Sequence, residues 1–334
     1  MMSNYSTLTA TIIRETKAAE DRMKLMEQTN GTRFFLQPNF SEKICLFFHG
    51  FTASPEQFLP IAKTFFQAGY NVIIPLLPGH GIAGEWDKDN PPPLPENKQI
   101  YQEFGLHWLQ FAQSLGEKVI VGGLSGSGTL VAWLALERSE QIYRTLAFAP
   151  FLSSSNHVVD LVVEKFNFYF KWRTRPGLAH FGYEGFFMPA LRVFLDMGAD
   201  VLAKAQYQKA APMSIVSSES DRAVDERELK ALFEAVLKLQ PKSWYISFDK
   251  MWDIPHTMLT LAEGNQYQDL LITIAKAYVE SDITWAEVEE ISDRIQQGYS
   301  FNTIINQLHL AWRVAPEFST FLDIIDSSIE ELKH

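Results

Sequence analysis

Short apolar runs and longer amphipathic segments alternate along most of the chain. The apolar runs are too short for helices, which predicts buried strands. They lie at residues 33–36, 44–48, 71–75, 118–122, 144–149, 213–218 and 243–248. Segments with helical periodicity lie at residues 9–28, 56–67, 99–115, 129–137 and 226–238. Because strands that alternate with helices form parallel sheets, the pattern predicts an α/β fold with a mostly parallel central sheet flanked by helices.

Two segments depart from this rhythm. Residues 153–210 interrupt the order of strands and helices and carry a dense set of aromatic side chains. Residues 282–334 contain no further strand pattern and read as a C-terminal helical extension. We therefore expect one domain over residues 1–281, with an insertion at about 153–210, followed by the extension at 282–334.

The C-terminal extension carries its own helix signals. Thr284 and Glu287 form a capping-box pattern that opens a helix ending near Gly298, and two further helices are expected at 300–314 and 316–332. Short helices with apolar faces must bury them against a neighbour. The pattern favours packing on the body of the protein or of these helices on each other, while contact with a dimer partner in a homo-oligomer or with a second protein through them stays open.

A serine stands at the junction of a predicted strand and a predicted helix. The strand at 118–122 leads into Gly-Leu-Ser-Gly-Ser-Gly at 123–128, and the helix follows at once. Such a bend strains the backbone and needs small neighbours. It exposes the hydroxyl of Ser125 at a helix N-terminus, where negative charge is favoured. A serine nucleophile presented in this way requires a base, an acid that orients the base, and backbone donors for the developing oxyanion.

The donors are expected just past the strand at 44–48, where the chain reads His-Gly-Phe-Thr from residue 49. A glycine at this point lets the backbone turn its amides toward the reacting oxygen. We expect the backbone N–H groups of Phe51 and Gly126 to form the oxyanion hole.

The base and the acid are expected in loops after later strands. His256 follows the last predicted strand and Pro255, at the start of a helix expected over 257–262. Asp221 follows the strand at 213–218 and could fix the tautomer of His256. Asp225 and Glu219 are alternatives in the same loop, and Asp225 is also placed to cap the following helix.

Several of these segments together resemble the α/β-hydrolases, in particular bacterial carboxylesterases and monoacylglycerol lipases. The similarity covers roughly residues 30 to 280, in the order serine, acid, base along the chain. Its segments are residues 49–55 (HGFTASP), 75–81 (PLLPGHG), 123–125 (GLS), 221–224 (DRAV) and the loop of His256.

The resemblance implies an α/β-hydrolase fold in which the insertion forms a helical cap. It also implies Ser125 as nucleophile, His256 as base, Asp221 as acid and a structural role for His80. Ser127 departs from this pattern, because the family has glycine two residues after the nucleophile. We expect the substrate pocket to be lined by Thr52, Leu124 and Phe151.

Composition narrows the class of protein. Hydrophobic residues make up 46% of the chain and charged residues 21%, as in soluble globular proteins. A net charge of −11 argues against nucleic-acid binding and against an electrostatic hold on anionic membranes. The single cysteine, Cys45, can form no internal disulfide, and no signal peptide or membrane-spanning run is evident. These features lead us to expect a cytoplasmic protein.

The predicted activity is hydrolysis of a carboxylic ester through an acyl-enzyme, with no metal or organic cofactor. The aromatic insertion points to a small-molecule ester with an apolar acyl group. A thioesterase or acyltransferase, and a peptidase or C–C bond hydrolase, would use the same residues. A non-catalytic binding protein on this fold is the alternative from a different class.

Overall fold

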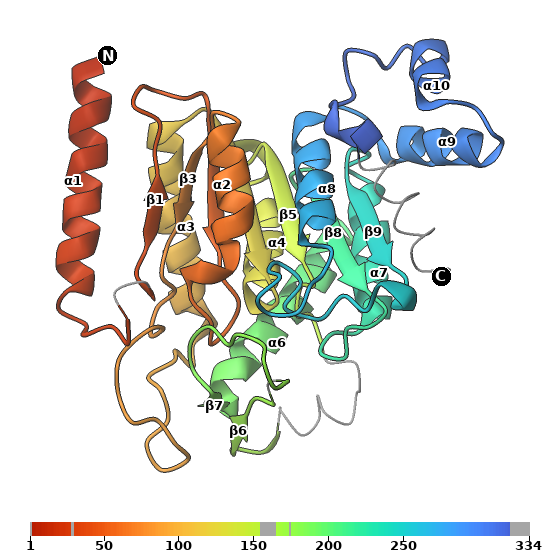
Figure 1. The fold of residues 1–334 in the computed structure, drawn as a ribbon. Helices are drawn as coiled ribbons and strands as arrows, with labels where there is room; N and C mark the ends of the chain where they lie inside the picture. The colour runs from red at the N-terminus through yellow and green to blue at the C-terminus, as the bar shows by residue number, and fades with distance from the viewer. Residues whose placement is uncertain (1, 28–29, 154–164, 174, 321–334) are drawn as a thin grey trace.

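The computed structural model describes residues 2–27, 30–153, 165–173 and 175–320. A seven-stranded sheet crosses the molecule in the order β1-β3-β2-β4-β5-β8-β9 (Figure 1). Its strands are β1 (Arg33–Phe35), β2 (Lys43–Phe48), β3 (Asn71–Ile74), β4 (Lys118–Leu124), β5 (Arg144–Phe148), β8 (Met213–Ser218) and β9 (Trp244–Phe248). Every strand lies within two residues of its predicted bounds.

The sheet is parallel except at one edge, where β1 runs antiparallel to β3. Its central strands are buried along almost their whole length, as strands covered on both faces must be. Burial of each large apolar side chain contributes about 1.5–3 kcal/mol. In a parallel sheet all carboxyl ends meet at one edge, so the loops after β2, β4, β8 and β9 converge there.

Helices cover both faces of the sheet, as the alternating pattern predicts. Helices α2 and α8 lie on one face, and α3, α4 and α7 lie on the other (Figure 1). Their bounds are α2 (Leu59–Gln67), preceded by the 3-10 helix η2 (Pro55–Phe58), α3 (Lys98–Leu115), α4 (Gly126–Glu137), α7 (Glu226–Leu237) and α8 (Gln268–Glu280).

The first helix, α1, spans Met2–Glu20, so the prediction of a helix over 9–28 was wrong at both ends. Tertiary contacts end it early. Glu20 accepts hydrogen bonds from the backbone N–H and the hydroxyl of Thr32, at 2.9 and 2.6 Å. Leu25 then forms a β-bridge with Ile82. A contact between distant segments thus replaces the last turns of the expected helix.

The described part of the insertion combines a helix with two short strands. Helix α6 (Met188–Ala205) packs on α3, α4 and α7. Strands β6 (Tyr169–Lys171) and β7 (Gly185–Phe187) pair antiparallel, and the sequence pattern did not predict them. Residues 154–164 and 174 of the predicted cap lie outside the described residues. The described part sits at the carboxyl end of the sheet (Figure 1).

The loop that carries His256 is not helical, so the helix predicted over 257–262 was wrong. The chain forms turns there, and α8 begins only at Gln268. Side chains hold these turns: the amide of Asn265 donates to the carbonyl of Met258 at 2.5 Å, and the N–H of Glu263 donates to the hydroxyl of Thr260 at 3.1 Å. Such local side-chain bonds compete with helix formation.

The described part of the C-terminal extension packs against the body of the protein at the amino end of the sheet (Figure 1). Helix α9 (Trp285–Gln296) opens on the predicted capping box of Thr284 and Glu287. The ring of Phe318 packs edge-on against Trp244 of β9, with centroids 5.7 Å apart. Packing on the body therefore buries apolar side chains of the extension, as the pattern favours.

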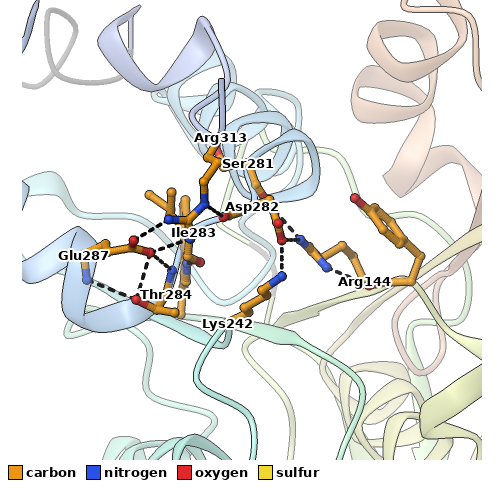
Figure 2. A network of polar contacts seen from close by, with 10 residues as sticks. Arg144, Lys242, Ser281, Asp282, Ile283, Thr284, Glu287 and Arg313 are labelled. Atoms are coloured by element: carbon orange, nitrogen blue, oxygen red, sulfur yellow. Dashed lines mark hydrogen bonds and ion pairs between the residues drawn. The ribbon is translucent and has the colours of Figure 1, made fainter. Parts of the chain in front are cut away.

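Ion pairs join the extension to the strands (Figure 2). Asp282 pairs with Lys242, just before β9, and with Arg144, the first residue of β5, at 3.4 Å. Within the extension, Arg313 donates two hydrogen bonds to the carboxylate of Glu287, at 2.6 and 2.9 Å.

Helix α10 (Phe301–Gln307) is shorter than the predicted helix at 300–314. His309 takes a left-handed conformation, with φ +56°, and the N–H of Leu310 donates back to Ile305 at 2.9 Å. This is the geometry of a Schellman ending. The last predicted helix, at 316–332, extends beyond the described residues.

Candidate active site

Ser125 lies at the bend between β4 and α4, in a strained backbone conformation with φ +59° and ψ −120°. Its glycine neighbours are required sterically. A Cβ added at Gly123 would lie 2.2 Å from the carbonyl oxygen of Ser127, and one at Gly126 would lie 2.9 Å from the ring of Phe194. The serine hydroxyl is therefore presented above the sheet by a bend that only small residues permit.

Ser127, which stands where the family has glycine, fits this bend. Its side chain is fully buried, and its hydroxyl donates to the carbonyl oxygen of His49 at 2.7 Å. The bond joins the first turn of α4 to the end of β2. Serine at this position thus adds a contact between the bend at Ser125 and the loop after β2, which carries the candidate oxyanion donor Phe51.

His256 joins Ser125 to Asp221. The Nδ1–H group of His256 donates to Oδ2 of Asp221 at 2.7 Å, and the Ser125 hydroxyl donates to Nε2 of His256 at 2.8 Å. The other carboxylate oxygen of Asp221 accepts the N–H of Ala223 at 2.7 Å. The structure therefore brings together the three residues predicted as nucleophile, base and acid.

The two alternative carboxylates are engaged elsewhere. Asp225 caps α7, as predicted, by accepting the N–H of Arg227 at 2.9 Å. Glu219 accepts the N–H of Lys250 at 3.1 Å. Asp221 is the carboxylate of this loop that bonds to His256 in the described part of the chain.

Opposing effects act on the pKa of His256. Burial alone would lower it, but the charge and the hydrogen bond of Asp221 raise it, and the carboxylate of Glu263 adds to this rise. The net pKa of His256 is raised above its usual value. The imidazolium form is thus stabilised, as a base that accepts the serine proton requires.

The loop after β2 contains one backbone N–H group without an acceptor among the described residues. The N–H of Gly50 donates to the side chain of Gln57 at 2.8 Å, and the N–H of Thr52 donates to Nε2 of His80 at 3.0 Å. Between them, the N–H of Phe51 has no acceptor among the described residues. The N–H of Gly126 belongs to the first turn of α4, where amides have no acceptor within the helix.

Two buried histidines hold this loop. Nε2 of His49 accepts the N–H of Leu77 at 3.1 Å, while the Nδ1–H groups of His49 and His80 donate to backbone carbonyls at 3.0 and 2.9 Å. Burial lowers the pKa of His49 well below its usual value and that of His80 to about 4. Both rings are therefore neutral near pH 7, because each needs an unprotonated Nε2 to accept its backbone N–H.

Aromatic side chains of the insertion lie against the loop after β2. The ring of Phe51 makes edge-on contacts with Phe186 and Phe194, with centroids 5.0 and 5.4 Å apart. The N–H of Tyr183 donates to the carbonyl of Thr52 at 2.8 Å, and the indole of Trp172 donates to the Thr52 hydroxyl at 2.8 Å. These ring contacts and hydrogen bonds hold the insertion against the loop of the candidate oxyanion donor Phe51.

The three predicted pocket residues are all buried near the site. Leu124 ends β4 directly before the serine, and its side chain lies within 3.5 Å of a Cβ position at Gly50. The N–H of Phe151 donates to the carbonyl of Ser125 at 3.0 Å. Their contact with substrate, like that of Thr52, stays a prediction.

Comparison with known proteins agrees with this geometry. A family model described as the alpha/beta hydrolase family matches residues 45–291, most of the chain. The chain belongs to the α/β-hydrolase family. The matched segment of this hydrolase contains Ser125, Asp221 and His256.

A similar curated protein is the thermostable monoacylglycerol lipase of Bacillus sp. (strain H-257). It is 36% identical over 90 residues, which cover 27% of this chain and 34% of that lipase. The match therefore spans about a third of the length of the curated relative.

Solved structures share the fold at low sequence identity. One comes from the metagenome-derived lipolytic enzymes LipS and LipT, with TM-score 0.60, 17% identity and coverage of 75% of this chain and 98% of that chain. The monoacylglycerol lipase of Paleococcus ferrophilus gives TM-score 0.55 and 16% identity, over 74% and 97% of the two chains. A soluble variant of the monoglyceride lipase of Saccharomyces cerevisiae gives TM-score 0.58 and 12% identity, with coverage of 77% of this chain and 95% of that chain.

In the described part of the chain, no helix combines the length and the apolarity that crossing a bilayer requires.

Proposed function

We propose that the protein is a serine hydrolase that cleaves carboxylic esters through an acyl-enzyme intermediate. The observation that carries the proposal is the continuous hydrogen-bonded series from Asp221 through His256 to the hydroxyl of Ser125. Its members come from three different strand ends, so their alignment has no evident structural purpose other than activating the serine.

The reaction follows from this arrangement. The oxygen of Ser125 attacks the ester carbonyl while Nε2 of His256 takes the hydroxyl proton. The N–H groups of Phe51 and Gly126 stabilise the oxyanion of the tetrahedral intermediate. His256 then gives its proton to the leaving alcohol, and water activated by the same nitrogen hydrolyses the acyl-enzyme. Asp221 holds the imidazole in the required tautomer and stabilises its charged form.

The proposed substrate is a small ester with an apolar, short- to medium-chain acyl group. The rings of Phe51, Phe186 and Phe194 support it, because they pack together as an apolar cluster beside the candidate oxyanion hole. Named relatives are lipases, which agrees with an ester substrate.

We also propose the division of the chain that the sequence predicts. The hydrolase domain covers 1–281, with its cap at about 153–210, and the extension covers 282–334. The change from strand-and-helix alternation to helices α9 and α10 supports a boundary near residue 282.

Labelling with a fluorophosphonate probe tests the proposal directly. We expect wild-type protein to be labelled on the peptide that contains Ser125, and the Ser125→Ala variant to be unlabelled. Ser139→Ala, in the 3-10 helix η3 (Ser139–Gln141) after α4, is the matched control and should label normally. Absence of label on folded wild-type protein would contradict an activated serine.

An oxygen ester and a thioester of the same acyl group then distinguish an esterase from a thioesterase. With the acyl chain held constant, we expect the oxygen ester to be hydrolysed at the higher kcat/KM. A clear preference for the thioester would reassign the protein as a thioesterase that uses the same residues.

A further inference from the structure

Glu263 is a buried carboxylate in the loop that carries His256. Its side chain accepts hydrogen bonds from the amide of Gln57 at 2.7 Å and from the hydroxyl of Thr260 at 2.9 Å. The residue is 6% exposed, and among the described residues no lysine or arginine pairs with it. A buried carboxylate without a cation destabilises the fold even when it is hydrogen-bonded, so its presence calls for an explanation.

Gln57 connects this carboxylate to the loop of the candidate oxyanion hole. Gln57 is 2% exposed; its Oε1 atom accepts the N–H of Gly50, while its Nε2 group donates to Glu263. The approach to Gly50 is close, since a Cβ there would lie 3.0 Å from Oε1 of Gln57. One side-chain amide thus bonds to both catalytic loops.

We propose that Gln57 and Glu263 are positioning residues that lock the loop of Phe51 and the loop of His256 into one arrangement. The inference rests on the proposed function, because it assigns those loops the oxyanion donor and the base. Within the described part of the chain, neither side chain bonds to Ser125, His256 or Asp221. Their effect is exerted through the backbone at Gly50 and through the turns held by Thr260.

The charge of Glu263 adds a second effect. Burial raises the pKa of Glu263 to about 7, although the hydrogen bonds from Gln57 and Thr260 and the charge of His256 lower it. The groups that bond to Glu263 from η2 and from its own loop, Gln57 and Thr260, are neutral, so His256 is the titratable group that acts on it. Ionised Glu263 in turn stabilises the imidazolium of His256 that forms during the reaction.

Kinetics of two variants test the bridge. Gln57→Leu removes both hydrogen bonds, and we expect kcat on an ester to fall at least about 10-fold, with KM within about 2-fold, because oxyanion donors act in the transition state. Glu263→Gln keeps the shape but removes the charge. It should move the acidic limb of the pH profile of kcat/KM to lower pH, because the pKa of His256 falls.

Gln240→Leu is the matched control, since Gln240 is also a buried glutamine, 8% exposed, but bonds to the carbonyl of Ala210 at the other end of the sheet. Its kcat should equal that of wild type. Equal kcat values for folded Gln57→Leu and Gln240→Leu would overturn the proposal, as would an unmoved acidic limb in Glu263→Gln. If Gln57→Leu does not fold, Gln57→Asn, which is too short to reach both partners, replaces it.

Hydrogen exchange separates this inference from the proposed function. We expect faster exchange at residues 49–54 and 256–263 in Gln57→Leu than in wild type or Gln240→Leu. Unchanged exchange in both segments would overturn the bridge, whatever the activity. A wild-type protein that neither labels nor hydrolyses esters would instead contradict the proposed function, and the exchange data would still decide the bridge.

Discussion

The loops at the carboxyl end of the central sheet and the extension docked at its amino end handle charge and backbone strain in different ways. At the amino end, Asp282 and Arg313 lie in a network of ion pairs whose members, apart from the buried Arg144, are partly exposed (Figure 2). At the carboxyl end, His49 and His80 are buried and neutral, and Glu263 is buried without a cation.

Strain follows the same division. Of the six non-glycine residues with positive φ in the described chain, four lie in loops that follow strands β2, β4, β5 and β9. They are Thr52, Ser125, Ala149 and Asp253. Strained backbone and buried ionisable groups without a counter-ion destabilise a fold, so they persist where the surrounding structure holds them in place. The difference supports the proposal that the carboxyl end carries the active site, while the ion pairs of the amino end attach the extension.

The largest expected effect lies at the carboxyl end. Ser125→Ala and His256→Ala should each lower kcat by at least about 10³-fold, because the triad acts as a unit. Ester hydrolysis and circular dichroism, measured on the same preparations, check activity and folding together. If either folded variant kept a rate within tenfold of wild type, the catalytic role proposed for the loops at the carboxyl end of the sheet would be contradicted.

The pH dependence of stability sharpens the comparison. The pKa of His80 is lower in the folded protein than in the unfolded chain, so its neutral form favours folding above pH 6.5. That stability is lost as the pH falls from about 6.5 toward 4, by up to about 3 kcal/mol. Urea unfolding from pH 4.5 to 7.5 measures it, with His80→Asn as the reference. The advantage of wild type over His80→Asn should shrink at low pH, and a constant difference would contradict the neutral, buried ring.

Glu287→Ala tests the amino end. It removes the partner of Arg313 and half of the capping box, which should cost about 1–2 kcal/mol without changing kcat. Glu290→Ala, which breaks an exposed pair with Arg294, should cost about 0.3–0.5 kcal/mol. Urea midpoints measure the loss of stability, and ester kinetics measure kcat. A loss of kcat in folded Glu287→Ala would contradict the prediction and show that the extension affects the candidate active site.

The smallest effect is expected at Ser127. Ser127→Gly restores the family pattern but leaves the buried carbonyl of His49 without its donor, at a cost of about 1 kcal/mol. We expect kcat to stay within a few-fold of wild type. Ser127→Ala, measured beside it, separates the lost hydroxyl from the added backbone freedom. A gain in stability for either variant would show that the hydroxyl contributes nothing.

Much of this architecture could be predicted from the sequence. All seven strands of the main sheet could be predicted, the central ones because burial on both faces leaves an apolar run and β9 because its residues alternate and are rich in aromatics. The loops of Ser125, Asp221 and His256 could be placed for the same reason, since each directly follows a strand. The helix expected at 257–262 was wrong because side chains of the loop, such as Asn265, bond to the backbone instead.

The sequence by itself determined the order of strands and helices, the serine bend and the few loops that could supply its partners. These are local properties, set by hydrophobic period and by which residues a sharp turn tolerates. Only the tertiary structure decided that Asp221, and not Glu219 or Asp225, bonds to His256, and that Gln57 bonds to Glu263, 206 residues away. Such pairings depend on how distant segments pack, and packing leaves no periodic trace in the chain.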